Sequence, residues 1–201
     1  QIRRSEKVFN MKRLLLILLL TFGFQSSTKA DDINDFKIEG MSIGDSLLDY
    51  FSKDEIKNST TYKYKNNKFI GVDLRLKNTK IYELVQIHYI PGKEYIIAST
   101  VGAIFYKDIN NCYKKKDEIV ADLSKFLENF KIINDGTFQA QEDETGKSTM
   151  TAVVFELENG EVGVTCSNYS NEFKIKNNYQ NNIRVDISTK EFSYWLRNEA
   201  F

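Results

Sequence analysis

The feature that most constrains the fold is one long amphipathic helix predicted in the middle of the chain. Between residues 109 and 130, apolar side chains recur close to the 3.6-residue period of an α-helix, and Asp108 is placed to cap the first turn. Asn134-Asp135-Gly136 is expected to end the helix, and the polar segment 139–148 is expected to be a mobile loop. The apolar face consists of Cys112, Ile119, Leu123, Phe126, Leu127 and Phe130.

Short strand patterns bounded by turn residues flank this helix on both sides. Before it, four antiparallel strands are expected to form a meander, with a two-residue turn at Asn66-Asn67. After it, a hairpin is expected around Glu158-Asn159-Gly160. The expected strands are 61–65, 68–76, 82–90, 94–99 with an extension over 101–106, 153–157, 162–166, and the weaker 172–176 and 183–187.

Capping boxes predict short helices at both ends of the domain. The pattern of Ser or Thr followed three residues later by Asp or Glu occurs at Ser42–Asp45, Ser52–Glu55 and Ser188–Glu191. Because strands joined by short turns pair antiparallel, the sequence predicts an α+β fold. An antiparallel sheet of about seven strands is expected to carry the long helix on one face.

The two cysteines, Cys112 and Cys166, both lie on predicted apolar faces, one on the long helix and one on a strand. Both sulfurs are therefore expected to point into the same core. A disulfide between them would close a loop of about 54 residues and stabilise the fold by about 4 kcal/mol. Two buried free thiols are the alternative, and a redox site is not expected because there is no Cys-x-x-Cys.

An export signal is predicted at residues 11–30. Two basic residues follow Met11, an apolar run covers 14–24, and small residues stand at Thr28 and Ala30. This order is typical of a secretory signal peptide. The run is shorter than the roughly 20 apolar residues of a transmembrane helix, although an uncleaved N-terminal anchor remains the alternative.

Cleavage is expected between Ala30 and Asp31. Residues 1–10 are interpreted as upstream residues that are not native to the protein, and 31–201 as a single α+β domain with no membrane span after cleavage. The expected location is periplasmic or secreted.

The charge of the expected mature chain argues against nucleic acid as a partner. Residues 31–201 hold 22 basic and 27 acidic side chains, a net charge of −5, with no basic cluster. Such a chain is not expected to bind nucleic acid or an anionic membrane surface.

No pattern of catalytic or metal-binding residues stands out. His88 is the only histidine, so it is the only available base for a Ser-His-Asp or Cys-His arrangement, and a structural or surface role is favoured. Gly146-Lys147-Ser148 resembles the end of a phosphate-binding loop but lacks its first glycine. Glu142, Asp143 and Glu144 fit a solvated acidic loop better than a calcium site. No cofactor, metal site or catalytic residue is predicted.

The segment Gly40-Met41-Ser42, which leads into an apolar stripe, locally resembles small bacterial outer-membrane assembly lipoproteins of the SmpA/OmlA type. The resemblance covers fewer than about 20 residues, and no cysteine near the cleavage junction is available for a lipid. It implies two helices followed by a three-stranded sheet, and a role in envelope assembly.

Three functions follow as hypotheses. The favoured one is a non-enzymatic bacterial envelope protein that binds another protein or a small-molecule ligand. A periplasmic hydrolase that uses carboxylates is the first alternative, because the chain has 27 acidic residues after Ala30. An assembly factor of the SmpA/OmlA type is the second.

Overall fold

The computed structural model describes residues 32–74, 81–92 and 94–200. The predicted signal peptide at 11–30 and the junction between Ala30 and Asp31 therefore lie outside the described residues. Within the described residues, no helix combines the length and the apolar character needed to cross a membrane.

Eight antiparallel strands form one sheet in the order β1-β2-β3-β4-β8-β7-β6-β5. The predicted α+β class, with an antiparallel sheet and one long helix packed on it, is confirmed, with one strand more than expected. The strands are β1 (Thr60–Lys63), β2 (Ile70–Leu74), β3 (Leu84–Ile90), β4 (Ile96–Phe105), β5 (Lys131–Gln139), β6 (Thr149–Glu156), β7 (Gly160–Asn168) and β8 (Asn182–Thr189).

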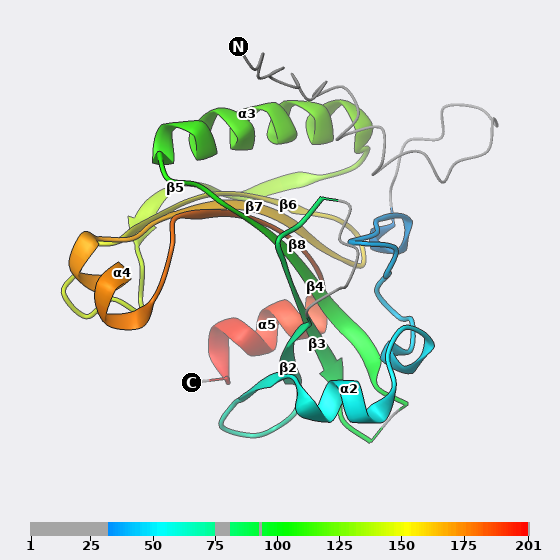
Figure 1. Ribbon diagram of the computed structural model, residues 1–201. Coiled ribbons are helices and arrows are strands. Elements are labelled where there is room, and N and C mark those ends of the chain that lie inside the picture. Colours follow the sequence, from blue (N-terminus) through cyan, green and yellow to red (C-terminus); the bar gives the residue numbers. More distant parts are fainter. Residues whose placement is uncertain (1–31, 75–80, 93, 201) are drawn as a thin grey trace, which may run out of the picture.

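The sheet is built from two successive meanders that meet at its centre. Strands β1 to β4 form the first, β5 to β8 form the second, and the last strand of each pairs with the other, as at Gly102 opposite Val185. Figure 1 shows the sheet bent, with its two halves at an angle. Strand β8, which the sequence pattern marked only as weak, is therefore central.

Alternation along β8 defines the two faces of the sheet. Ile183, Val185 and Ile187 belong to the large apolar core, and we call the side they occupy the outer face. Arg184 and Asp186 point to the opposite side, which lies inside the bend and which we call the inner face. This period of two follows from the strand geometry and makes one side apolar and the other polar.

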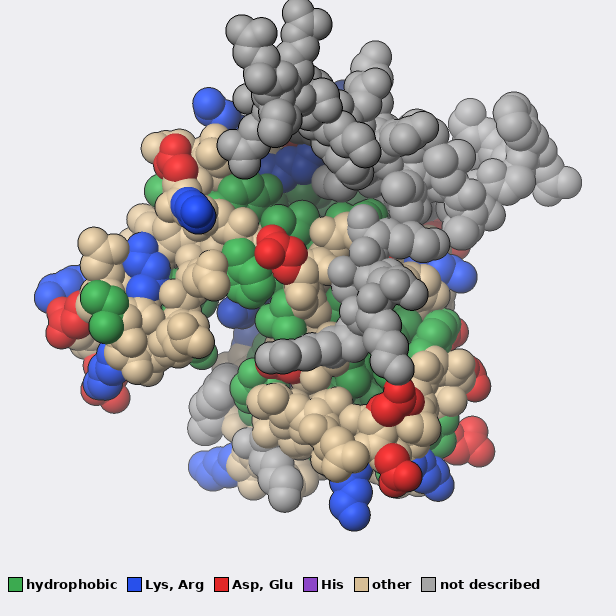
Figure 2. Space-filling view, viewed as in Figure 1, with side chains coloured by type: hydrophobic (Ala, Val, Ile, Leu, Met, Phe, Trp, Pro, Cys, Tyr) green, Lys and Arg blue, Asp and Glu red, His purple; other side chains and the backbone are tan. Residues whose placement is uncertain are grey.

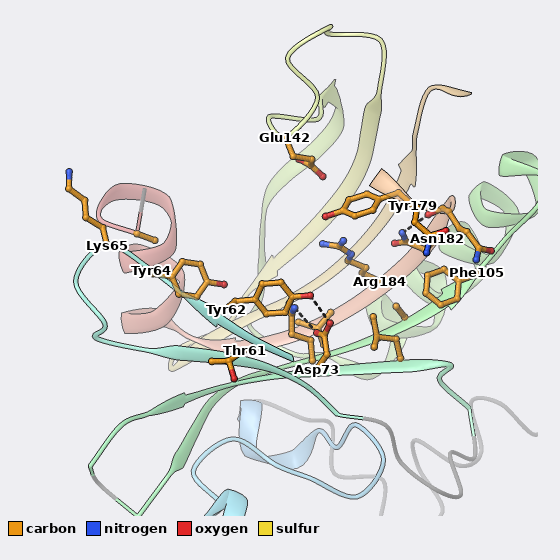
Figure 3. A pocket seen from close by; sticks show the side chains of 17 residues that line it. Thr61, Tyr62, Tyr64, Lys65, Asp73, Phe105, Glu142, Tyr179, Asn182 and Arg184 are labelled. Atoms are coloured by element: carbon orange, nitrogen blue, oxygen red, sulfur yellow. Dashed lines mark hydrogen bonds between the residues drawn. The ribbon is translucent and has the colours of Figure 1, made fainter. Parts of the chain in front are cut away.

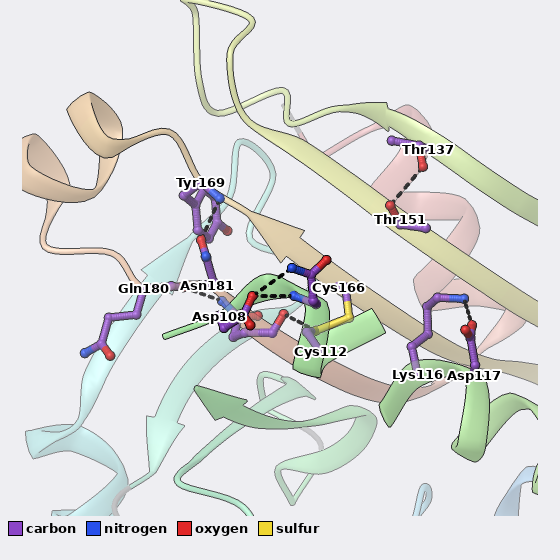
Figure 4. Close-up of a disulfide and its surroundings, with 12 residues drawn as sticks. Asp108, Cys112, Lys116, Asp117, Thr137, Thr151, Cys166, Tyr169, Gln180 and Asn181 are labelled. Carbon is purple, nitrogen blue, oxygen red and sulfur yellow. Dashed lines mark hydrogen bonds and ion pairs between the residues drawn. A yellow bond between two sulfur atoms is a disulfide. The ribbon is translucent and has the colours of Figure 1, made fainter. Parts of the chain in front are cut away.

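The outer face is covered by α3 (Ile109–Phe126), the predicted long helix. Asp108 caps it as expected, because its side chain accepts a hydrogen bond from the Asn110 backbone N–H at 3.0 Å. The disulfide between Cys112 of α3 and Cys166 of β7 is present, with a Cα–Cα distance of 6.0 Å (Figure 4). It fixes the first turns of α3 to the sheet, as the two apolar faces predicted.

Strand β5 occupies the residues at which the long helix was expected to end. The structure ends α3 at Phe126, four residues early, and Asn134-Asp135-Gly136, expected to end the helix, lies inside β5. The polar composition is tolerated because β5 is an edge strand that pairs only with β6.

Two other local predictions are wrong, and a third is confirmed. Residues 172–176, expected as a strand, lie in helix α4 (Asn171–Asn177), which Ser170 caps. The expected two-residue turn at Asn66-Asn67 is a longer connection between β1 and β2, with Asn67 in the left-handed region at φ 49°. The strand expected over 94–99, with its extension over 101–106, is confirmed as β4, which begins at Ile96 and ends at Phe105.

The segment before the sheet packs on the outer face next to the meander β1 to β4. It contains two 3₁₀ helices, η1 (Ile33–Asp35) and η2 (Leu47–Asp49), and α2 (Lys53–Asn58). Ser52–Glu55 forms the predicted capping box. Ser42–Asp45 instead closes a turn, and Ser46 caps η2. The two helices and three-stranded sheet implied by the SmpA/OmlA resemblance are not the arrangement seen.

The inner face carries a second, smaller core under the C-terminal helix α5 (Lys190–Asn198). Trp195 is fully buried and contacts the ring of Phe69 at a centroid distance of 4.9 Å. Its indole N–H donates to the Asn66 side chain at 2.9 Å. The capping box predicted at Ser188–Glu191 is shifted by one residue, because Thr189 and not Ser188 accepts the capping hydrogen bond from Phe192 N–H. The C-terminal helix thereby holds the β1–β2 connection against the second meander.

Candidate functional site

A pocket of about 770 Å³ lies on the part of the inner face that α5 leaves uncovered. Figure 2 shows the molecule hollowed beside the lobe that carries α4. The volume lies within the usual range of small-molecule sites, about 300–1,000 Å³. The lining comes from β1, β2, β3, β4 and β8, from the loops before β6 and β8, and from Ala200 near the C-terminus.

The pocket floor, formed by the inner face of β4 and β8, has mostly short side chains. Ala103 of β4 lies opposite Arg184 of β8, which in turn lies opposite Thr165 of β7. One row further along the sheet, Val101 lies opposite Asp186, which lies opposite Gly163. Because Ala103 and Thr165 are short, the Arg184 side chain reaches into the pocket. Asp186 instead lies over Gly163 and is not among the lining residues.

Arg184 is the half-buried cation of the site. Figure 3 shows its side chain pointing into the cavity, between Tyr179 on one side and Tyr62 and Tyr64 on the other. Within the described part of the chain, its guanidinium has no hydrogen bond and no ion pair. A guanidinium presents five N–H donors, so several remain open to a ligand.

Asp73 of β2 is held by neutral donors on the wall opposite α4. The Tyr62 hydroxyl donates to Oδ2 at 2.6 Å, and the Gln86 amide donates to Oδ1 at 3.0 Å (Figure 3). Burial, followed by this hydrogen bond to Asp73, raises the pKa of Tyr62 above its ordinary value. The hydroxyl therefore stays protonated at physiological pH and remains a hydrogen-bond donor.

His88 supports the pocket wall from beneath. It is 3% exposed, its Nε2 lies 2.9 Å from the Tyr64 hydroxyl, and its ring packs 4.6 Å from the Phe192 ring. Gly71 leaves the space for it, since a Cβ there would lie 3.0 Å from the imidazole. Burial, and then the Arg184 charge, lowers the pKa of His88 to about 4. The favoured structural role fits this buried position, in which the imidazole orients Tyr64.

The acidic segment before β6, expected as a loop, is a loop made of hydrogen-bonded turns. Asp143 is buried and accepts hydrogen bonds from Thr145 Oγ1 at 2.7 Å and from Ser148 N–H at 3.0 Å. Hydrogen bonds from Ser148, followed by those from Thr145, lower the pKa of Asp143 to about 2. Glu142 turns the other way, lines the pocket and accepts from the Tyr169 hydroxyl at 3.0 Å. The two carboxylates thus bind separate donors.

Two further polar residues lie on the inner face of β8, and of these only Asn182 lines the pocket. Asn182 lines the pocket, donates to the Gln180 carbonyl at 3.0 Å and keeps a buried Oδ1 that has no partner among the described residues. Asp186 is half-buried beside Val101. Burial raises the pKa of Asp186 to about 6, the Arg184 charge acts in the opposite direction, and Glu161 adds a smaller increase.

The residues singled out from the sequence lie apart in the structure. The Cys112–Cys166 disulfide is on the outer face, His88 is beneath the pocket wall, and Lys147 pairs with Glu172 at 2.9 Å on the surface. Sequence reasoning missed Arg184, although the alternation of Ile183, Arg184 and Val185 already placed a charge on the face opposite the apolar one.

Comparison with known proteins adds no relative. No family model matches the chain, and no curated protein sequence and no solved structure is significantly similar to it.

Proposed function

We propose that this protein is an exported binding domain that takes a small-molecule ligand in the inner-face pocket. The observation that carries the proposal is the pocket itself: about 770 Å³, walled by tyrosines and amides, with the Arg184 guanidinium open to it. Concave sites with apolar walls and a few converging polar groups are the usual form of small-molecule sites. The Asp73 and Glu142 carboxylates of the lining already accept hydrogen bonds from protein donors, so these parts of the wall are ordered before a ligand arrives.

The location outside the cytoplasm has separate support. The signal pattern at 11–30 and the disulfide between Cys112 and Cys166 both fit an oxidising compartment. Fractionation of cells that express the full chain, with intact-mass analysis, tests it. We expect a periplasmic or secreted species that begins at Asp31 and has no alkylatable thiol. A cytosolic species that retains Met11 and two free thiols would refute the location, and recovery with the outer membrane would favour the assembly-factor hypothesis.

Binding is tested with a pocket-filling variant and a matched control. Ala103→Phe places a ring on the pocket floor, whereas Ala121→Phe makes the same change on the exposed surface of α3. A small-molecule library is screened by ligand-observed NMR. We expect ligands that bind the wild type and Ala121→Phe but not Ala103→Phe. Equal binding to all three proteins, or no ligand for any of them, would contradict the proposal.

A hydrolase is the second candidate, and Asp186 is the observation that favours it. A carboxyl group with a pKa of about 6 beside a pocket is suited to general-acid catalysis near neutral pH. The test is activity on nitrophenyl glycosides and esters, compared between the wild type and Asp186→Asn. Turnover that Asp186→Asn abolishes would establish it, and inactivity of the wild type would remove its support.

A further inference from the structure

We propose that the pocket binds the carboxylate of a small monocarboxylic acid, with Arg184 as the residue that holds it. This inference rests on the proposed function and specifies the chemical class of its ligand. It is carried by the open guanidinium, by the pairing of the acidic groups around it and by the aromatic walls.

Arg184 is placed to receive an anion and has no anionic partner among the described residues. Its neighbours across the sheet, Ala103 and Thr165, are too short to cover it or to offer a charged partner. It is half-buried, so its donors are partly withdrawn from water without a protein acceptor among the described residues. A planar guanidinium matches a carboxylate with two parallel hydrogen bonds, and such charge-assisted pairs are the strong ones.

The acidic groups in the lining are engaged elsewhere. Asp73 accepts from Tyr62 and Gln86, and Glu142 accepts from Tyr169. Neither forms an ion pair with Arg184. These carboxylates still place negative charge at the cavity, whereas Lys65, the other basic residue of the lining, points away from the cavity in Figure 3. This balance decides between classes of anion. A phosphate monoester carries a charge of about −1.5 to −2 near pH 7 and would be repelled more strongly than a single carboxylate.

The aromatic side chains of the pocket wall indicate that the rest of the acid, apart from its carboxylate, is apolar or planar. Tyr62 and Tyr179 line the cavity while 40% and 43% exposed, and Phe105 and Leu84 lie on the same surface. Aromatic rings that remain exposed around a cavity supply contact area for an apolar ligand. The Asn182 side chain adds a buried polar atom without a described partner at the same end as Phe105.

The test compares acids with their neutral amides. The probes are 4-phenylbutyrate and decanoate, their primary amides, and phenyl phosphate, titrated by calorimetry and by ligand-observed NMR against the protein expressed as the full chain with its disulfide intact. We expect each acid to bind the wild type at least about tenfold more tightly than its amide, the difference that one charge-assisted hydrogen bond supplies.

Arg184→Gln removes the charge and keeps hydrogen-bonding capacity. It is expected to bring the acid-to-amide ratio to about one without changing the affinity for the amides. Lys125→Gln, at a lysine whose side chain is 78% exposed on α3, is the control and is expected to keep the wild-type ratio. Arg184→Gln is expected to melt within about 2 °C of the wild type, because no described hydrogen bond or ion pair is lost.

Each other outcome overturns the inference. Acids that bind no better than amides, phenyl phosphate that binds more tightly than the acids, or a preference that persists in Arg184→Gln would each refute it. If the amides bind and Ala103→Phe abolishes that binding, the pocket remains a ligand site while its assignment to carboxylates fails. If no probe binds, both the inference and the proposed function lose their basis.

Discussion

The two faces of the sheet are closed in different ways. The outer face carries the larger core, packed under α3 and the N-terminal segment, its core residues are almost entirely apolar, and a disulfide joins helix to strand. The inner face has only the short helix α5 and a small aromatic core, and beyond that core it is open and polar. The same strands build both faces, since successive residues of β8 point to opposite sides.

This difference indicates a division of roles. Apolar burial on the outer face supplies most of the hydrophobic stabilisation, which leaves the inner face free to carry Arg184 and Asp186, groups that contribute little to folding. Residues that bind are often placed on a scaffold stabilised elsewhere. The predictions below test whether stability and pH response divide between the two faces as this account requires.

The largest effect is expected from the inner-face core. Trp195→Ala removes a fully buried indole and its hydrogen bond to Asn66, so the free energy of unfolding is expected to fall by about 3–5 kcal/mol. Urea unfolding followed by far-UV circular dichroism measures it. Tyr194→Ala, at the adjacent residue that is 61% exposed, is the control and is expected to change stability by less than about 0.5 kcal/mol. Similar effects of the two variants would contradict the second core.

The second-largest effect on stability is expected from the disulfide on the outer face. Replacing both Cys112 and Cys166 by Ala opens a crosslink that spans 54 residues, so stability is expected to fall by about 4 kcal/mol. The same unfolding measurement applies, with the wild type in reducing agent as the comparison. Because the bond lies on the outer face, binding in the pocket is expected to persist under conditions where the variant is folded. A loss below about 1 kcal/mol would show that the crosslink does not constrain the unfolded chain as expected.

His88 is expected to make the protein sensitive to acid. Its pKa is about 4 in the folded state against 6.5 when exposed, so the unfolded chain binds more protons between these values. Stability from this group is therefore complete above pH 6.5 and decreases as the pH falls towards 4, by about 3 kcal/mol in total. His88→Gln is expected to remove this slope whatever its effect on stability at pH 7. An unchanged slope in the variant would exclude a buried, neutral imidazole.

Asp186 is expected to change the pH dependence of stability in the opposite direction to His88, and by a smaller amount. Its pKa is about 6 in the folded state against 3.8, so the folded protein binds more protons in that window and loses stability as the pH rises through it. Asp186→Asn is expected to be more stable than the wild type at pH 7, by about 1–2 kcal/mol because solvent screens this half-buried group, and equal to it near pH 3. Lower stability of the variant at pH 7 would contradict a costly buried charge.

Much of the outer face could be predicted from the sequence, for a physical reason. Apolar side chains recur with the period of a helix around Cys112 and with the period of a strand around Cys166, so both sulfurs could be placed in one core. Edge and surface elements lack such a signal. Ile175 alternates with lysines in a way that favours a strand, yet it is 86% exposed on α4, where the capping by Ser170 decides the conformation.

The candidate site was not predictable because no short stretch of sequence contains it. Tyr62, Asp73 and Gln86 come from the first meander, Glu142 from a turn, and Arg184 from the last strand. Their proximity depends on β4 pairing with β8, a contact between the two halves of the chain that local patterns do not specify. The one local signal of the site in the sequence is the alternation of Ile183, Arg184 and Val185, which puts Arg184 on the face of β8 opposite the apolar one.

The central claim, that the ligand binds on the inner face and not on the outer face under α3, is tested most directly by mapping backbone amide shifts while 4-phenylbutyrate is titrated into the labelled protein. The account predicts that the shifted amides cluster at residues 84–86, 101–105 and 182–186, and that those in the middle of α3 stay unchanged. Shifts concentrated on α3 and β5, or none at saturating concentrations of the acid, would contradict it.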